Sequence, residues 1–174
     1  MDRLIPIVTN EWYHVYNRGN DRNTLFRVTA DYRAFAMKME QACAKHKVER
    51  IAYAPMPNHF HVILKQLTEG DLPRTMGALG TSYAKRYNLR YDRTGHVFQG
   101  RYRYTHIASG EALLNVARYI HLNPVRAYLV SKPEDWEFSD FKQWTEERIS
   151  YAAFVRKGAD DIEAVRQALF GEPG

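Results

Sequence analysis

The segment Met56-Pro57-Asn58-His59-Phe60-His61-Val62-Ile63-Leu64 organises the rest of the chain. It places two histidines on either side of one large apolar residue, directly after a turn that contains a proline. In an extended strand successive side chains alternate between faces, so His59 and His61 point to one face of a sheet and Phe60 to the other. Two imidazoles on one face form half of a metal site, although such a pair also occurs as hydrogen-bonded structural histidines.

Strand and helix patterns alternate along the chain around this segment. Strands are expected at 11–17, at 48–54, from His59 onward and at 97–107, the last with a bulge at Gly100. Helices are expected at about 29–47, 73–89 and 109–123, with Pro124 ending or kinking the third. This order predicts an α+β fold of the ferredoxin-like (split βαβ, RRM-like) type, a single antiparallel sheet with helices on one face. We expect the other face to be open for function and to carry His59 and His61.

The end of the chain differs in character from the part before it. We expect residues 1–130 to form the functional domain and residues 131–174 to form a helical C-terminal extension packed on the same domain. Aromatic residues at 136–144 are expected to anchor this extension, and an acidic terminal helix is expected to follow.

Composition narrows the class of protein and its partners. The 174 residues are 45% hydrophobic and 26% charged, as in ordinary globular proteins. The single Cys43 excludes an internal disulfide and a cysteine-based zinc site. No apolar run is long enough to span a bilayer, and the N-terminus lacks a signal-peptide pattern, so we expect a cytoplasmic protein with no membrane contact. Residues 81–130 carry eight basic and two acidic side chains, interleaved with tyrosines, which indicates a nucleic-acid surface.

A catalytic metal held by His59 and His61 needs a further ligand. Candidates are four other histidines and the amide of Asn123; the histidines are His14, His96, His106 and His121. Asn123 lies one helical turn after Tyr119, so both side chains project toward the same point. A mixed nitrogen and oxygen site suits Mg²⁺ or Mn²⁺ acting on a phosphate, with the Tyr119 phenol as nucleophile. With twelve tyrosines in the chain, a packing role for Tyr119 is the simpler alternative.

Four segments, in this order along the chain, resemble the REP-associated tyrosine transposases of the HUH single-tyrosine superfamily. They are Tyr13-His14-Val15-Tyr16-Asn17-Arg18-Gly19-Asn20, Met56-Pro57-Asn58-His59-Phe60-His61, Gly95-His96-Val97-Phe98-Gln99-Gly100-Arg101-Tyr102 and Arg118-Tyr119-Ile120-His121-Leu122-Asn123-Pro124-Val125-Arg126. The resemblance implies that His59 and His61 bind a divalent metal and that Tyr119 is the nucleophile. It also implies a substrate of single-stranded DNA with REP-like hairpins, cleaved and rejoined through a covalent 5′-phosphotyrosine intermediate.

The basic and aromatic residues of this region are the predicted DNA contacts. They are Arg18, Arg101, Tyr102, Arg103, Tyr104, Arg118 and Arg126. We expect the protein to be nucleoid-associated and to act as a monomer or a homodimer.

Two other functions remain open from the sequence. In a metal-dependent nuclease water attacks the phosphate, Tyr119 is structural and no covalent protein–DNA adduct forms. In a non-enzymatic single-strand binder the tyrosines and arginines of an open sheet stack bases, and binding is indifferent to chelators and to loss of His59.

Overall fold

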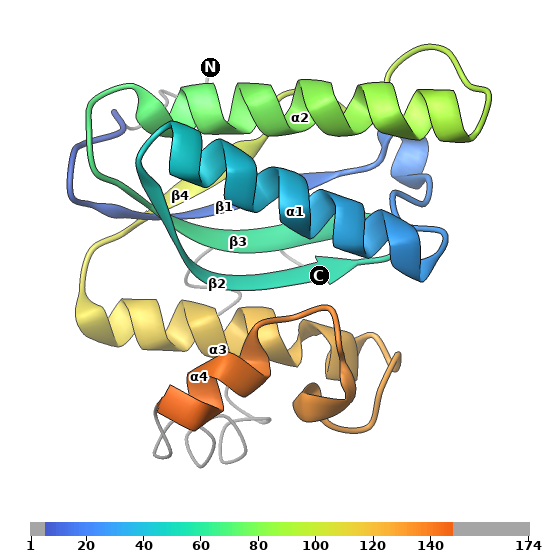
Figure 1. Ribbon diagram of the computed structural model, residues 1–174. Coiled ribbons are helices and arrows are strands. Elements are labelled where there is room, and N and C mark those ends of the chain that lie inside the picture. The colour runs from blue at the N-terminus through green and yellow to red at the C-terminus, as the bar shows by residue number, and fades with distance from the viewer. Residues whose placement is uncertain (1–5, 148–174) are drawn as a thin grey trace.

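The computed structural model describes residues 6–147. Its four strands are β1 (Trp12–Arg18), β2 (Val48–Met56), β3 (His59–Gln66) and β4 (Arg103–Ile107). They form one antiparallel sheet in the order β2-β3-β1-β4 (Figure 1). Its main helices are α1 (Thr29–Lys45), α2 (Asp71–Arg90), α3 (Gly110–Arg126) and α4 (Phe141–Glu147). Two short 3-10 helices, η1 (Asn20–Arg22) and η2 (Pro133–Asp135), complete the element order. The predicted ferredoxin-like α+β fold is confirmed.

Helices α1 and α2 cover one face of the sheet, as the strand alternation predicts. Phe60, Val62 and Leu64 on β3 are buried in one cluster with side chains of both helices. Phe35 of α1 packs against Phe60 with ring centroids 4.9 Å apart, and against Tyr83 of α2 at 5.0 Å. The burial of Phe60 on this side turns its two neighbouring histidines toward the opposite face.

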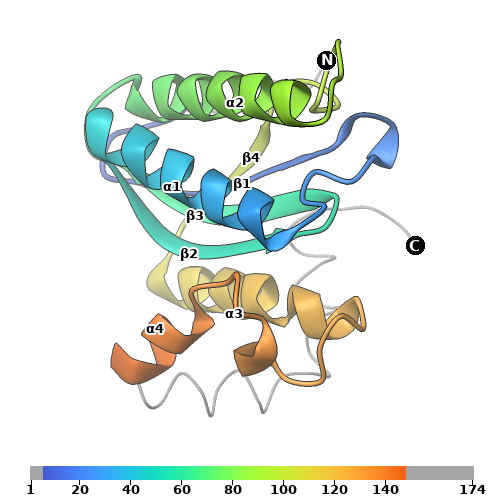
Figure 2. The ribbon, with the colours of Figure 1, turned by 45° about the vertical axis from the view of Figure 1, so that its right-hand side comes forward.

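The second face of the sheet is not open, which corrects the expectation from the sequence. Helix α3 packs across it, and Figure 2 shows α3 on the opposite side of the strands from α1 and α2. The apolar stripe of α3, including Val116 and Ile120, is buried with Ala52, Ala54 and Ile63 of the sheet. These small and branched residues make the second face apolar, and burying it against α3 removes that surface from water.

Two further expectations about local structure need correction. The fourth strand is shorter than 97–107, because Phe98 makes only an isolated bridge to Gly19 and the sheet pairing resumes at Arg103. Helix α3 does not end at Pro124 but continues to Arg126. Proline removes one backbone donor, and the last turn is still closed by the hydrogen bond from Ala127 N to Asn123 O, 2.9 Å long.

The aromatic residues that follow α3 contact both the sheet and helix α1. Trp136 Nε1 donates to Pro55 O at 2.9 Å, and Trp144 Nε1 donates to Ile51 O at 2.7 Å. Phe138 stacks on Tyr32 of α1 with centroids 3.9 Å apart. The predicted acidic terminal helix lies outside the described residues. Within residues 6–147, no helix has the length and apolar character needed to cross a membrane.

Candidate active site

The two histidines of β3 lie in cross-strand rows on the face covered by α3. In the strand register, Tyr16 of β1 stands between His61 and Arg103, and Arg18 stands beside His59. The rings of His59 and His61 have centroids 5.1 Å apart and meet at 85°. The predicted placement of both histidines on one face is therefore confirmed.

Each histidine of the pair has a partner that bears on its tautomer. Asn58 Oδ1 lies 2.7 Å from His59 Nδ1, which fits an Nδ1–H donor and leaves the Nε2 lone pair for a ligand. His14 Nε2 lies 3.0 Å from His61 Nδ1. The lone pair of His61 Nε2 is available to a ligand only when His61 Nδ1 donates this hydrogen bond to His14.

The electrostatics of the site keep these imidazoles neutral. Burial lowers the pKa of His14 to about 3 and the pKa of His59 to about 4, with the nearby Arg18 charge contributing at His59. Burial also lowers the pKa of His61 well below its ordinary value, with smaller contributions from His14 and His59. Neutral imidazole is the form that binds a metal ion, so the site has ligands in the required state at pH 7.

Helix α3 brings Tyr119 directly over the histidines. Val116 and Ile120 hold this helix on the sheet, and Tyr119, between them on the same surface, is only 8% exposed. Its ring lies edge-on to His61 with centroids 5.7 Å apart, and its centroid is 6.3 Å from that of His14. The predicted association of Tyr119 with the histidine pair is present in the fold.

Asn123 lies one turn after Tyr119 on α3. Its Nδ2 atom, a hydrogen-bond donor, is buried and has no hydrogen-bond partner within residues 6–147, whereas a cation would be bound through the Oδ1 atom of the amide. Among the described residues, no three His, Cys, Asp or Glu side chains converge in a metal-binding group. Two neutral histidines and an amide fit a mixed nitrogen and oxygen site whose remaining positions go to water or substrate oxygens.

The other histidines considered as third ligands are engaged elsewhere. His106 Nε2 is 2.9 Å from Glu11 Oε2, and His121 Nε2 is 2.8 Å from Asp140 Oδ1 in the buried contact between α3 and the segment before α4. His96 is exposed in the loop after α2. Tyr16, with its ring centroid 5.9 Å from that of His61, was absent from the predicted site. The alternation His14, Val15, Tyr16 on one strand was the signal that could have identified it.

The predicted DNA contacts separate into different regions. Arg103 is exposed and points to the histidine face, as its register with Tyr16 requires. Arg18 is exposed beside His59 and hydrogen-bonded to Gln99. Arg126 is half-buried at the C-terminal end of α3, whereas Arg118, only 6% exposed, is buried within that helix.

Tyr102 and Tyr104 lie on the α2 side, where both pack against the core. The Tyr104 ring meets Tyr13 edge-on at 5.9 Å. Arg101 and Tyr102 line a cavity of about 580 Å³ between α2 and residues 95–102. Base stacking by these two tyrosines on an open sheet face, as in the binder hypothesis, is thus inconsistent with their positions.

A ferredoxin-like sheet with a histidine pair facing a tyrosine on a covering helix makes up a small α+β domain. The family model described as "Transposase IS200 like" matches residues 7–123, and the chain belongs to this family of transposases. No curated protein matches the chain significantly.

One solved structure supports the same fold. The structure of a REP-associated tyrosine transposase bound to a REP hairpin is similar with a TM-score of 0.64 and 24% sequence identity, covering 82% of this chain and 83% of that one. A putative transposase from Deinococcus radiodurans aligns with a TM-score of 0.49 and 17% identity, covering 69% of this chain and 95% of that one. The predicted membership of a transposase family is confirmed by the family model, and the similarity to the REP-associated tyrosine transposase shows a shared fold.

Proposed function

We propose that the protein cleaves and rejoins single-stranded DNA that carries hairpins, with Tyr119 as the nucleophile. The observation that carries this proposal is the position of Tyr119 on α3, whose ring centroid is 5.7 Å from that of His61 on β3. A structural tyrosine does not require a neutral histidine pair beside it. A tyrosine that attacks a phosphate held at those histidines requires the neutral histidine pair beside it.

The reaction exchanges one phosphate ester for another. The Tyr119 oxygen attacks the scissile phosphorus, the bond from phosphorus to the 3′ oxygen breaks, and the phenol proton is transferred so that a free 3′ hydroxyl leaves. The 5′ phosphate is then bonded to tyrosine. A 3′ hydroxyl attacks this phosphotyrosine in the second step and regenerates the phenol, so the strand is rejoined without ATP.

His59, His61 and Asn123 are the residues that would hold a divalent cation, Mg²⁺ or Mn²⁺. Such an ion, when bound, neutralises and orients the non-bridging oxygens of the scissile phosphate. Asn58 and His14 fix the orientation of the two imidazoles, and burial under α3 keeps both neutral. These residues supply positioning, which is the main contribution of a protein to phosphate transfer.

The proposed substrate follows from the charge around the site and from the family. Arg18 and Arg103 flank the histidines on the same face, and Arg126 follows Asn123 on α3, so phosphates on either side of the cleaved bond meet cations. The similar transposase was solved with a REP hairpin bound. We therefore propose REP-like hairpin DNA as the substrate and the nucleoid as the place of action, with the protein acting as a monomer or homodimer.

A denaturing gel of labelled hairpin-bearing single strand with Mn²⁺ tests the proposal. The parent protein should give a cleaved strand and a gel-stable adduct that peptide mapping assigns to Tyr119. Tyr119→Phe should give neither, and His59→Ala should give neither at the same metal concentration. Cleavage by Tyr119→Phe at the parental rate would favour the water-attacking nuclease, and no cleavage by any protein would favour the binder.

A further inference from the structure

We propose that a second DNA-binding surface lies at one end of the α1 and α2 layer, on the opposite side of the sheet from Tyr119. It consists of Arg27, Arg86, Arg90 and Arg93, here called the arginine cluster. We infer that it binds the phosphodiester backbone of the hairpin part of the substrate. The choice of DNA as the partner rests on the proposed function; the anionic character of the partner rests on the cluster itself.

Two tyrosines near the end of α2 hold three members of the cluster in fixed positions. Arg27 Nε donates to Tyr87 Oη at 3.0 Å, and its guanidinium carbon lies 4.3 Å from the Tyr91 ring centroid. Arg93 lies over the Tyr87 ring at 5.7 Å, and Arg90 over the Tyr91 ring at 5.7 Å. These contacts fix the guanidinium planes, so less conformational entropy is lost when an anion binds them.

One buried carboxylate lies at the centre of the cluster. Asp31, 1% exposed, has Oδ1 at 3.5 Å from Arg90 Nε and at 3.9 Å from Arg86 Nη1. Its Oδ2 accepts hydrogen bonds from the backbone nitrogens of Arg27 and Val28, at the start of α1, and from the Tyr91 hydroxyl. The capping of α1 therefore explains why a carboxylate is buried at Asp31, and one arginine is enough to neutralise its charge.

The remaining positive charge of the cluster is not neutralised by a second carboxylate among the described residues. Within residues 6–147, no carboxylate other than Asp31 lies within ion-pair distance of any member of the cluster. The cluster has four guanidinium groups and one carboxylate, which contacts only Arg86 and Arg90, and these two repel each other as like charges at i and i+4 on α2. An anionic partner with several charges would offset this repulsion.

The chemistry of the surface fits phosphodiesters. The side chains of Arg86 and Arg90 are 29% and 41% exposed, so their nitrogens remain accessible while their stems are packed. A guanidinium fork matches two phosphate oxygens, and successive forks along a surface match successive phosphates of a backbone. Interleaved arginine and tyrosine side chains are typical of nucleic-acid surfaces, whereas an acidic peptide has no equivalent regular spacing of charge.

The position of the cluster relative to Tyr119 allows one substrate to reach both. The N-terminal end of α1 and the C-terminal end of α2 lie at the same end of the molecule as the start of β3, where His59 stands, and the end of β1, at Arg18 (Figure 1). A strand that leaves the histidine face at this end passes Arg18 and then meets the arginine cluster. The hairpin would thus be held on one side of the sheet while the flanking single strand is cut on the other.

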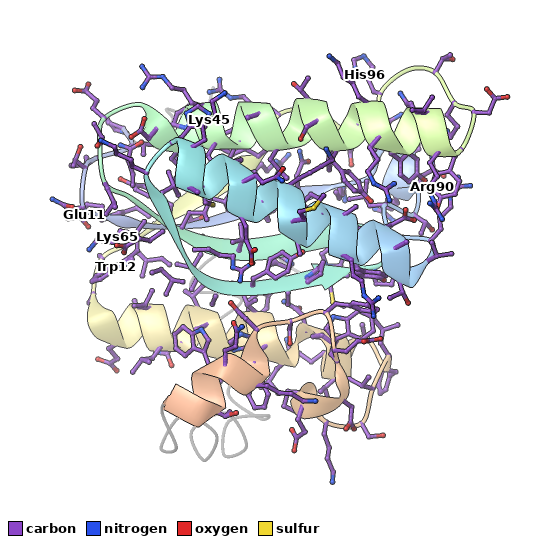
Figure 3. The ribbon with its side chains drawn as sticks, in the orientation of Figure 1. Glu11, Trp12, Lys45, Lys65, Arg90 and His96 are labelled. Carbon is purple, nitrogen blue, oxygen red and sulfur yellow. The ribbon has the colours of Figure 1, made fainter. Side chains whose placement is uncertain are left out.

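The test compares Arg27→Gln/Arg93→Gln with Lys45→Gln/Lys47→Gln in the full chain. Neither Arg27 nor Arg93 contacts Asp31 through its side chain, so the cap of α1 survives in the first variant. Both variants lose two positive charges, but Lys45 lies at the opposite end of the helical layer from Arg90 (Figure 3). The probe is a fluorescein-labelled DNA hairpin with a single-stranded flank, and anisotropy gives the dissociation constant over a range of NaCl concentrations.

We expect the slope of log affinity against log salt to flatten by about two in the cluster variant and to remain parental in the lysine variant, because each lost phosphate contact removes about one unit. A slope in the cluster variant equal to that of the lysine variant would overturn the inference. Binding of polyglutamate by the parent but not by the cluster variant, with an unchanged slope of log DNA affinity against log salt, would also overturn the inference. The surface would then select an acidic polypeptide. The single variant Arg93→Gln should flatten the slope by about one. Melting temperatures of all variants show whether each of them is folded.

The Tyr119 adduct, measured on a short unstructured strand, separates this inference from the proposed function. An adduct that forms normally in both variants, together with a flattened hairpin slope, supports both proposals. A flattened slope without any adduct in the parent supports the surface and removes the tyrosine mechanism. A normal adduct with an unchanged hairpin slope supports the tyrosine mechanism and removes the arginine cluster as a DNA-binding surface.

Discussion

Tyr119 and His61 face each other across the contact between α3 and the sheet, with their rings edge-on and 5.7 Å apart. The two residues are distant in the sequence and belong to different elements, so their meeting depends on the placement of α3 on the second face. The same placement buries both residues, each of which is 8% exposed. Electrostatic interactions with a bound phosphate are stronger in such a site than at an open surface.

Replacement of Tyr119 by Phe should separate chemistry from binding and folding. The ring remains packed against His61, so the free energy of unfolding should fall by about 1 kcal/mol or less, as for the loss of one hydroxyl hydrogen bond. Hairpin affinity should stay within about 2-fold of the parent, since the arginines carry it. Chemical denaturation and anisotropy measure the two quantities, and a loss of several kcal/mol would instead assign Tyr119 a structural role.

Loss of His59 should weaken metal binding while leaving the fold intact. His59 is less buried than His61, so His59→Ala is the cleaner variant. Its Mn²⁺ affinity, measured by calorimetry without DNA, should drop by at least about 10-fold, because one of two imidazole ligands is missing. His96→Ala, an exposed histidine in the loop after α2, is the matched control. Equal Mn²⁺ affinity for parent and His59→Ala would exclude the histidine pair as the metal site.

The hydrogen bond between His14 and His61 should tune this metal affinity without contributing a ligand. His14→Phe fills the same space but cannot accept from His61 Nδ1, so the tautomer with a free Nε2 loses its partner. Partners of this kind are worth about 10-fold to 100-fold in metal affinity, and we expect a loss in that range. A loss of more than about 100-fold would show that His14 is itself a ligand.

Several features of the site were predictable because alternation and helical spacing are local. Phe60 between two histidines fixed which face the pair would occupy, and the four-residue spacing of Tyr119 and Asn123 placed both on one flank of α3. The face of the sheet that α3 covers was not predictable in the same way. The apolar stripe of α3 indicates that the helix is buried, but it does not indicate which surface covers it. The residues that do so include Ala52, Ala54 and Ile63, which lie far from α3 in the sequence.

The DNA contacts were harder to predict for a related reason. Alternation correctly separated Arg103 from Tyr104, but both arginines and both tyrosines of 101–104 were predicted as DNA contacts, and Arg101 and Tyr102 lie before β4 and line the same cavity. The strand register shows that Arg103 shares the histidine face and that Tyr104 packs against Tyr13 on the other. Arg118 was chosen for its charge alone, whereas its position on α3 between Ala117 and Tyr119 buries it.

Arg103 should contact a DNA phosphate at the histidine face. Arg103→Ala should flatten the slope of log affinity against log salt by about one unit for single-stranded DNA that contains the cleavage site. Lys65→Ala is a suitable control, because Lys65 points to the same face but lies beside Trp12 at the far end of β3 (Figure 3). Equal slopes for Arg103→Ala and the parent would place the DNA away from this edge of the sheet. Arg101→Ala, on the side of the cavity, tests whether the strand continues around β4 with a further loss of about one unit.

The buried histidines should make the fold sensitive to acid. The pKa of His14 is lowered to about 3 and that of His59 to about 4, so in the folded protein both stay neutral well below their ordinary pKa of 6.5. The unfolded chain binds protons on these residues below about pH 6.5, and the folded chain does not. Stability should therefore be constant with respect to these groups above that pH and should fall as the pH decreases from about 6.5 toward 4. Each group contributes a slope of at most about 1.4 kcal/mol per pH unit.

His14→Phe should reduce this slope, because one of the groups that titrate only in the unfolded chain is gone. Urea unfolding in the presence of a chelator, at several pH values between about 7.5 and about 4.5, measures the free energy of unfolding for parent and variant. The difference between them should shift in favour of the variant as the pH falls. His96→Gln should keep the parental pH dependence, since its side chain is exposed in the folded protein. If His14→Phe and the parent lose stability in parallel over this range, His14 is not held neutral in the fold, and the electrostatic account of the site fails with it.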